Sequence, residues 1–189
     1  GVDPATGLYK FTDADGNGIL NTADKIAVVS ADPDWYGGIS NTFSLHNFDL
    51  NIFFEFKKQK GLNYLSQANL GVTAFGYTNK PSIVLNRWQK PGDNALIQKY
   101  TATTGTVWRN ANTYLRQSDG VYSDASFVRC KNISISYNIK SSFFNKIKLT
   151  GTRIYFQAQN LFTITKYKGA DPETQNMFIL PPLKTITFG

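Results

Sequence analysis

The stretch that most constrains the fold is residues 36–56, YGGISNTFSLHNFDLNIFFEF. From Phe48 onward apolar and polar residues alternate with a period of two, and Phe53 is the only exception. Successive side chains of a β-strand point to opposite faces, so this period predicts one apolar face and one polar face. The apolar set is Phe48, Leu50, Ile52, Phe54 and Phe56, and the polar set is Asp49, Asn51 and Glu55.

A second alternating run, residues 36–45, precedes this one, with Asn41 out of phase. His46 and Asn47 separate the two runs, and a two-residue connection that contains Asn is typical of a tight hairpin turn. The sequence therefore predicts an antiparallel hairpin over residues 36–56. Whether its apolar face meets a protein core or lipid decides the function.

Three further segments alternate in the same way and predict strands at 127–139, 152–167 and 183–189. Between them, residues 1–35, 57–126 and 168–182 are rich in turn signals and are expected to form long irregular loops, with a short helix near 82–88. The connections at 46–47 and 140–151 are short, and the second contains an apolar Phe143-Phe144 pair. Short and long connections therefore alternate along the chain.

The composition excludes several classes of function. With 14 Phe, 10 Tyr and 3 Trp but only 17% charged residues, the chain favours β structure over disorder. The net charge of +7 is spread out, and the one basic cluster, residues 57–60, lies at a strand end, so no nucleic-acid partner is expected. A single cysteine, Cys130, permits no intrachain disulfide and no cysteine zinc site. Paired carboxylates, a Ser–His–Asp set and a phosphate loop are all missing from the sequence, so we expect no enzyme.

Residues 13–24, DADGNGILNTAD, have the spacing of a calcium-binding loop. Calcium prefers oxygen ligands from closely spaced side chains plus a backbone carbonyl, with a glycine at the sixth position for the sharp turn. The candidate ligands are Asp13, Asp15, Asn17, the Ile19 carbonyl, Asn21 and Asp24. Asp24 stands where a longer Glu is usual, and no amphipathic helix flanks the loop, so an Asp/Gly-rich turn without an ion is the alternative.

Two aromatic–basic pairs lie in the long loop, Arg87-Trp88 and Trp108-Arg109. Aromatic faces beside polar groups suit recognition of sugars or peptides, which makes these four residues candidate substrate contacts. The alternative is that the two tryptophans anchor the packing of the loop.

The polar faces of the expected strands consist of Asn, Ser, Gln, Thr and Tyr more than of Lys and Glu, which suits a water-filled lumen. Outer-membrane barrels combine such strands with short turns at one end and long loops at the other. The predicted fold is therefore all-β, with antiparallel up-and-down strands forming part of a large transmembrane β-barrel with long extracellular loops. The alternatives are a soluble carbohydrate-binding or adhesin-type β-sandwich stapled by calcium, and a fragment of a calcium-dependent glycan hydrolase.

Several short strings, taken together in order, resemble the C-terminal part of the SusC/RagA-like family of TonB-dependent outer-membrane transporters. The strings are DADGNG at 13–18, DPDWYGG at 32–38, NTF at 41–43, FDL at 48–50, SFVRCKNI at 126–133, QNLFTITKY at 159–167 and GADPE at 169–173. Each string is weak alone, and the ordered set is specific.

The resemblance implies a barrel of about 22 strands with a plugged lumen, in the outer membrane of a Gram-negative bacterium. It implies a SusD-like surface lipoprotein as partner, glycans or peptides as substrates, and energy from TonB. The plug and the TonB-contacting region have no counterpart in this sequence, which begins at Gly1 without Met and stops at Gly189 inside an alternating run. We therefore expect a segment of a longer protein, whose few strands cannot close a barrel and pair with the rest of it.

Overall fold

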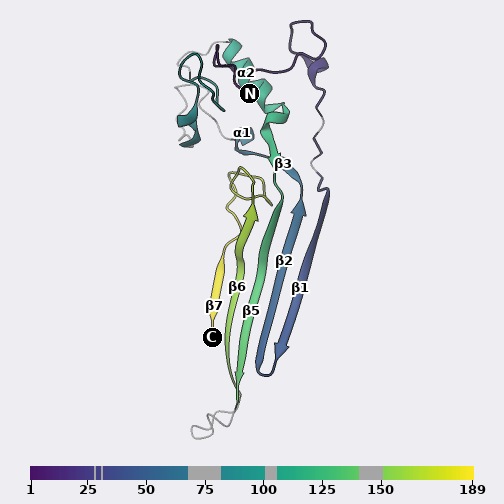
Figure 1. Ribbon diagram of the computed structural model, residues 1–189, viewed down its shortest axis with the longest axis vertical. Helices are drawn as coiled ribbons and strands as arrows, with labels where there is room; N and C mark the ends of the chain where they lie inside the picture. Colours follow the sequence, from purple (N-terminus) through teal and green to yellow (C-terminus); the bar gives the residue numbers. More distant parts are fainter. Residues whose placement is uncertain (28, 31, 68–81, 101–105, 141–150) are drawn as a thin grey trace.

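Five antiparallel strands form one long open sheet in a computed structural model that describes residues 1–189 except 28, 31, 68–81, 101–105 and 141–150 (Figure 1). The strand order is β1-β2-β5-β6-β7, and each strand pairs antiparallel with the next. The strands are β1 (Trp35–Leu45), β2 (Phe48–Lys58), β5 (Phe127–Ile139), β6 (Thr152–Thr165) and β7 (Thr185–Phe188). The antiparallel up-and-down arrangement predicted from the alternation is confirmed, and the sheet does not close on itself.

The predicted hairpin is present as β1 and β2, joined by His46 and Asn47. Leu45 pairs with Phe48 at the turn, and His46 has a φ of +56°. A left-handed residue lets two residues reverse the chain, and histidine is among the non-glycine residues that adopt this conformation more readily. The short connection predicted at 140–151, with its Phe143-Phe144 pair, lies almost wholly outside the described residues.

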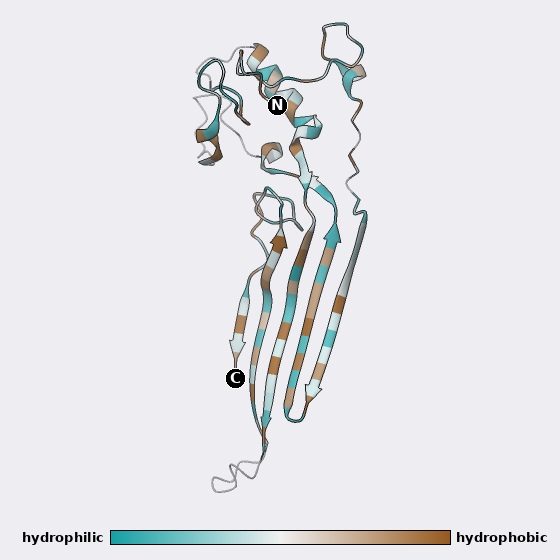
Figure 2. Ribbon diagram, viewed as in Figure 1, coloured by the Kyte–Doolittle hydropathy of each residue, from teal (hydrophilic) through white to brown (hydrophobic). Residues whose placement is uncertain are grey.

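The register places residues of one kind side by side across all five strands. Phe43, Leu50, Ile135, Phe156 and Phe188 form one continuous cross-strand row. The adjacent row, on the opposite face, consists of Thr42, Asn51, Ser134, Gln157 and Thr187. Figure 2 shows the resulting alternation of brown and teal along each strand. The sheet therefore has an apolar face and a polar face, as the sequence predicted for 48–56.

The apolar face is exposed. Ile39 is 59% exposed, Ile154 57% and Phe188 74%. Among the described residues, the only other sheet has two strands, β3 (Lys60–Leu62) and β4 (Tyr122–Asp124), and it lies beyond the end of the large sheet (Figure 1). A β-sandwich needs a second sheet packed face to face on the first, so the described chain does not form the sandwich considered as an alternative.

The polar face is held by hydrogen bonds between side chains of neighbouring strands. Thr42 donates to Asn51 at 2.8 Å, Ser44 donates to Asp49 at 2.7 Å, and the Arg153 guanidinium donates to a hydroxyl on β5 at 2.8 Å. Phe53, the residue that broke the alternation, also lies on this face. Its ring covers Gly38, where an added Cβ would stand only 2.6 Å from it, so the glycine makes room for the ring.

A cap of short helices and strands lies at one end of the sheet (Figure 1). Besides β3 and β4 it contains η1 (Thr22–Asp24), α1 (Tyr64–Gln67), η2 (Ser82–Asn86), α2 (Thr106–Arg116) and η3 (Asp119–Val121). The interval 57–126 was expected to be mainly irregular, and this expectation was wrong for much of its described part. The short helix expected near 82–88 is present as the 3-10 helix η2.

The helix that the sequence analysis missed, α2, buries one face in the cap. Trp108, Ala111 and Leu115 follow at helical spacing and are 5–7% exposed. Ala111 and Leu115 form a small core with Tyr9 and Val121, so the N-terminal segment is tied to the cap. Among the described residues, no helix is both long enough and apolar enough to cross a membrane.

Candidate functional site

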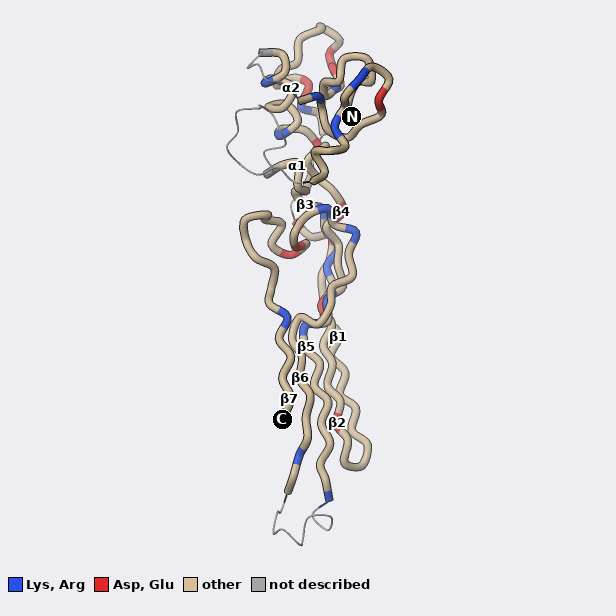
Figure 3. The backbone as a smooth tube through the Cα atoms, turned by 90° about the vertical axis from the view of Figure 1, so that its left-hand side faces the viewer, with Lys and Arg blue, Asp and Glu red and all other residues tan. Residues whose placement is uncertain are grey.

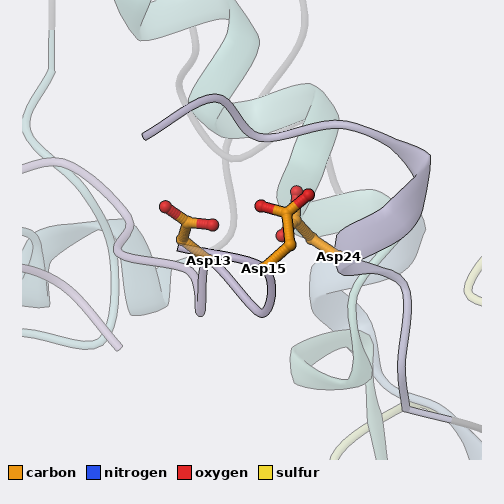
Figure 4. Close-up of side chains that lie close together, drawn as sticks. All are labelled: Asp13, Asp15 and Asp24. Carbon is orange, nitrogen blue, oxygen red and sulfur yellow. The ribbon is translucent and has the colours of Figure 1, made fainter. Parts of the chain in front are cut away.

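The acidic loop, residues 13–24, brings three carboxylates together at the outer end of the cap. One carboxylate oxygen from each of Asp13, Asp15 and Asp24 lies within 4.8 Å of the others (Figure 4). The two oxygens of Asp24 accept the backbone N–H groups of Ala14 and Asn21, both at 2.8 Å. The hydrogen bonds from Asn21 and Ala14 lower the pKa of Asp24, which keeps this carboxylate ionised at neutral pH.

The turn of this loop has features that a calcium-binding loop needs. Gly18, at the sixth position, has a φ of +79°, which is the turn that a calcium loop needs there. Asp13 accepts the N–H groups of Gly16 at 2.8 Å and Gly18 at 2.7 Å. Each carboxylate oxygen has about two lone pairs, so an oxygen that accepts one N–H keeps a lone pair for a cation. The three carboxylates of the predicted ligand set are thus brought together, and binding of an ion by this loop stays a prediction.

The remaining predicted ligands organise the same turn. Asn17 accepts the N–H of Ile19 at 2.7 Å, and Asn21 donates to the Ile19 carbonyl at 3.0 Å. Asn21 also caps η1, which forms the last turn of the loop itself. Among the described residues, no other helix lies between Gly1 and β1. The loop therefore stands without the two flanking helices of a calcium sensor, and an ion here would staple the loop.

The two tryptophans proposed as substrate contacts join separate loop segments. Trp88 donates its indole N–H to the Pro4 carbonyl at 2.9 Å, and Trp108 donates to the Lys99 carbonyl at 3.0 Å. The half-buried Arg87 lies over the Tyr100 ring at 5.9 Å, and Arg109 is exposed on α2. These contacts fit the alternative in which the tryptophans anchor loop packing. Contact of the four residues with substrate stays a prediction.

A buried cluster of charges on the polar face escaped the sequence analysis. The Arg129 side chain on β5 is 2% exposed and forms ion pairs with Asp171 and with Glu173, the latter at 2.6 Å. Its Nε donates to the Thr163 hydroxyl at 2.9 Å. Lys131 extends the cluster, with its Nζ 3.1 Å from Glu173 and 2.9 Å from a carboxylate on β2. Figure 3 shows charged residues in the cap and just below it, and few along the strands beyond.

The two acidic residues belong to a loop that we call the bracket loop, residues 168–176, which follows β6. Gln59 donates to the Pro172 carbonyl at 2.8 Å, and the Tyr64 N–H donates to the Lys168 carbonyl at 3.0 Å. Tyr167, just before the loop, donates its hydroxyl to the Leu62 carbonyl. The bracket loop therefore joins the polar face of the sheet to the base of the cap.

Known proteins with similar sequences and structures indicate the family to which this chain belongs. No family model matches the chain. The chain is 35% identical over 171 residues to TonB-dependent receptor P3 of Formosa agariphila, a match that covers 90% of this chain and 16% of the relative. It is 28% identical over 167 residues to TonB-dependent receptor SusC of Bacteroides thetaiotaomicron, covering 88% of this chain and 15% of the relative.

The chain belongs to the TonB-dependent receptor family. Among solved structures, the RagAB peptide transporter matches with a TM-score of 0.63 at 27% identity, over 92% of this chain and 19% of that chain. The chain spans about a sixth of the length of the curated relatives it matches. Its open sheet is what a partial barrel of a SusC-like receptor has, and the resemblance inferred from the short strings is confirmed. TonB-dependent receptors are outer-membrane proteins, and the names of these relatives are those of receptors and transporters rather than of enzymes.

The bracket loop brings together residues from two of the strings that indicated this receptor family. The string 126–133 supplies Arg129 and Lys131, and the string 169–173 supplies Asp171 and Glu173. The strings are about forty residues apart in sequence, and the register of β5 with β6 brings them into contact.

Proposed function

We propose that this chain contributes barrel wall and extracellular cap to a SusC-type importer of glycans or peptides in the outer membrane of a Gram-negative bacterium. The observation that carries the proposal is the five-stranded open sheet with an exposed apolar face and a hydrogen-bonded polar face. In this proposal the apolar face meets lipid, the polar face lines the lumen, and the cap faces the cell exterior. Import proceeds by capture and movement of the solute, without bond chemistry.

The dimensions of the apolar face support this assignment. On β2 it runs from Phe48 to Phe56, which is eight residue steps. At about 3.4 Å per residue this is roughly 27 Å along the strand. Outer-membrane barrels have an apolar band about 25 Å tall, and a strand tilted by about 45° needs about 9–11 residues to cross the membrane. Strand β2 as a whole has 11 residues, so it is long enough to cross such a band.

The proposed partners follow from the family and from the open edges of the sheet. Strands β1 and β7 each have one neighbour within the described chain, and an unpaired edge in lipid is costly. We propose that the rest of the barrel pairs with these edges and encloses a plug. A SusD-like lipoprotein would cover the cap, and TonB would act through the N-terminal part of the whole receptor.

The importer proposal is tested by deleting the gene that encodes the receptor in its host. We expect loss of growth on the particular glycan or peptide that the receptor imports, and the same loss when TonB is removed. The receptor should fractionate with the outer membrane and need detergent for extraction. Unchanged growth across glycan and peptide panels, or a monodisperse receptor without detergent, would contradict the proposal.

We also propose that the acidic loop binds Ca²⁺, supported by the convergence of its carboxylates. Added Ca²⁺ should raise the melting temperature of the cap in the purified receptor, because a ligand at a hundredfold excess over its Kd stabilises by about 2.7 kcal/mol. Asp13→Asn should remove most of the shift, since it neutralises the first ligand. Asp32→Asn, an exposed carboxylate outside the loop, should leave the shift intact. Calorimetry measures both, and the absence of a shift in the unchanged receptor would remove the calcium proposal.

A further inference from the structure

A cavity of about 380 Å³ opens in the cap between three segments of the chain. Its walls are the N-terminal segment at 9–12, the end of the acidic loop with the residues after it at 20–27, and the end of α2 with η3. Figure 1 shows the N-terminal segment running beside α2, with the acidic loop at its far side. The volume lies in the range of small-molecule sites, which is about 300–1,000 Å³.

The floor of the cavity is aromatic and held in place. Tyr9 belongs to the buried core of the cap, and its burial raises the pKa of its hydroxyl to about 12, so the ring stays neutral. Phe11 and Tyr114 meet edge to face, with ring centres 5.8 Å apart at 77°. The Tyr114 hydroxyl donates to the Leu20 carbonyl at 3.3 Å, which ties α2 to the opposite wall. The floor is therefore formed before any ligand arrives.

The rim carries charges of both signs. Lys10 and Lys25 contribute ammonium groups, and Asp24 and Asp119 contribute carboxylates, from different walls of the cavity. A singly charged ligand would meet a like charge on at least one wall, whereas a neutral ligand rich in hydroxyls could accept from the lysines and donate to the aspartates. A sugar ring also has an apolar C–H face that fits an aromatic floor.

We propose that this cavity is a binding site for one or two units of a neutral saccharide, held on the aromatic floor by the half-buried Phe11 and Tyr114 rings. The site is coupled to the acidic loop, because Asn21 and Asp24 belong to both. An ion that fixes Asp24 would also fix the cavity wall and so favour saccharide binding. By reciprocity, a bound saccharide would raise the affinity of the loop for the ion. The coupling rests on the proposed calcium function, and the saccharide site does not.

The test measures binding of maltose and cellobiose to the purified whole receptor by saturation-transfer NMR and calorimetry. We expect at least one disaccharide to bind, and Asp119→Asn to weaken it by about tenfold or more, the usual loss for one hydrogen bond to a charged group. Phe11→Leu, which keeps an apolar side chain but removes the ring, should also weaken binding. Asp32→Asn is the matched control outside the cavity and should bind as the unchanged receptor does.

Each other outcome counts against the proposal. Absence of disaccharide binding, or equal binding by the Asp119→Asn variant, would overturn the site. Binding of trialanine that Asp119→Asn abolishes, without disaccharide binding, would assign the cavity to peptides instead. Chelation of calcium should weaken binding of the disaccharide. If the affinity for the disaccharide were unchanged, the coupling alone would be overturned. Binding by the purified receptor needs no TonB, so a failure of the importer proposal in cells is separable from a failure here.

Discussion

Replacement of Arg129 by methionine is expected to destabilise the folded receptor by about 3–5 kcal/mol, the cost of removing one partner from a buried ion pair. Met replaces the apolar stem of Arg129 but is shorter and uncharged, so it leaves Asp171, whose side chain is 6% exposed, without its guanidinium partner. Asp171 also accepts the N–H groups of Glu173 and Thr174 at 3.0 and 3.1 Å, so it shapes the bracket loop from within. Urea unfolding of the receptor in lipid vesicles measures the loss, and hydrogen exchange should rise first in residues 168–176.

The matched control is Lys58→Met, which breaks an ion pair with Asp124 at 3.9 Å between side chains that are about half exposed. Exposed pairs contribute about 0–1 kcal/mol, so this variant should stay close to the unchanged receptor. Adding Asp171→Asn to Arg129→Met should restore part of the stability, because it removes a buried unpaired charge. If Lys58→Met and Arg129→Met lower the free energy of unfolding by equal amounts, the buried cluster does not hold the bracket loop.

The strands could be predicted because the alternation that indicates each strand lies within that strand's own residues. The alternation at 48–56 needs no distant partner, and the His46-Asn47 turn sets the register of the hairpin. The calcium-like spacing at 13–24 could also be recognised in the sequence, since all its candidate ligands lie within twelve consecutive residues. Local sequence therefore predicted the strands and the candidate ligands of the acidic loop, and binding of an ion there stays a prediction.

The features that escaped depend on contacts between distant residues. Arg129 lies 42 residues before Asp171, and their ion pair follows from the register of β5 with β6, which includes a shift between Cys130 and Asn132. A residue out of step, Lys131, thereby reaches the same side as Arg129 and joins the cluster. Helix α2 was missed although Trp108, Ala111 and Leu115 follow at helical spacing. Its neighbours are rich in turn signals, and its apolar face is buried by contacts with the distant Tyr9.

A second large loss of stability is expected from a charged substitution on the apolar face. Ile135→Arg should destabilise the assembled barrel by about 2–4 kcal/mol, the cost of an arginine near the middle of the lipid face. Ile135 lies in the continuous apolar row with Leu50 and Phe156. Ser134→Arg is the matched control, because it adds the same side chain one residue away on the polar face, opposite Asn51 and Gln157. The control should cost much less, because a side chain that faces a lumen remains hydrated.

The dependence of the cost on depth in the bilayer distinguishes lipid from a protein partner on the apolar face. If a protein partner covered that face in water, a buried arginine would be costly wherever it lay in the contact, and the cost would not follow depth in a bilayer. In lipid, the cost of an arginine falls towards about 0–1 kcal/mol near the interface. Ile154→Arg, two residue positions nearer the turn end of the sheet on the same face, should therefore cost less than Ile135→Arg. Equal unfolding free energies for the two outward arginines in vesicles would show that this face does not meet lipid.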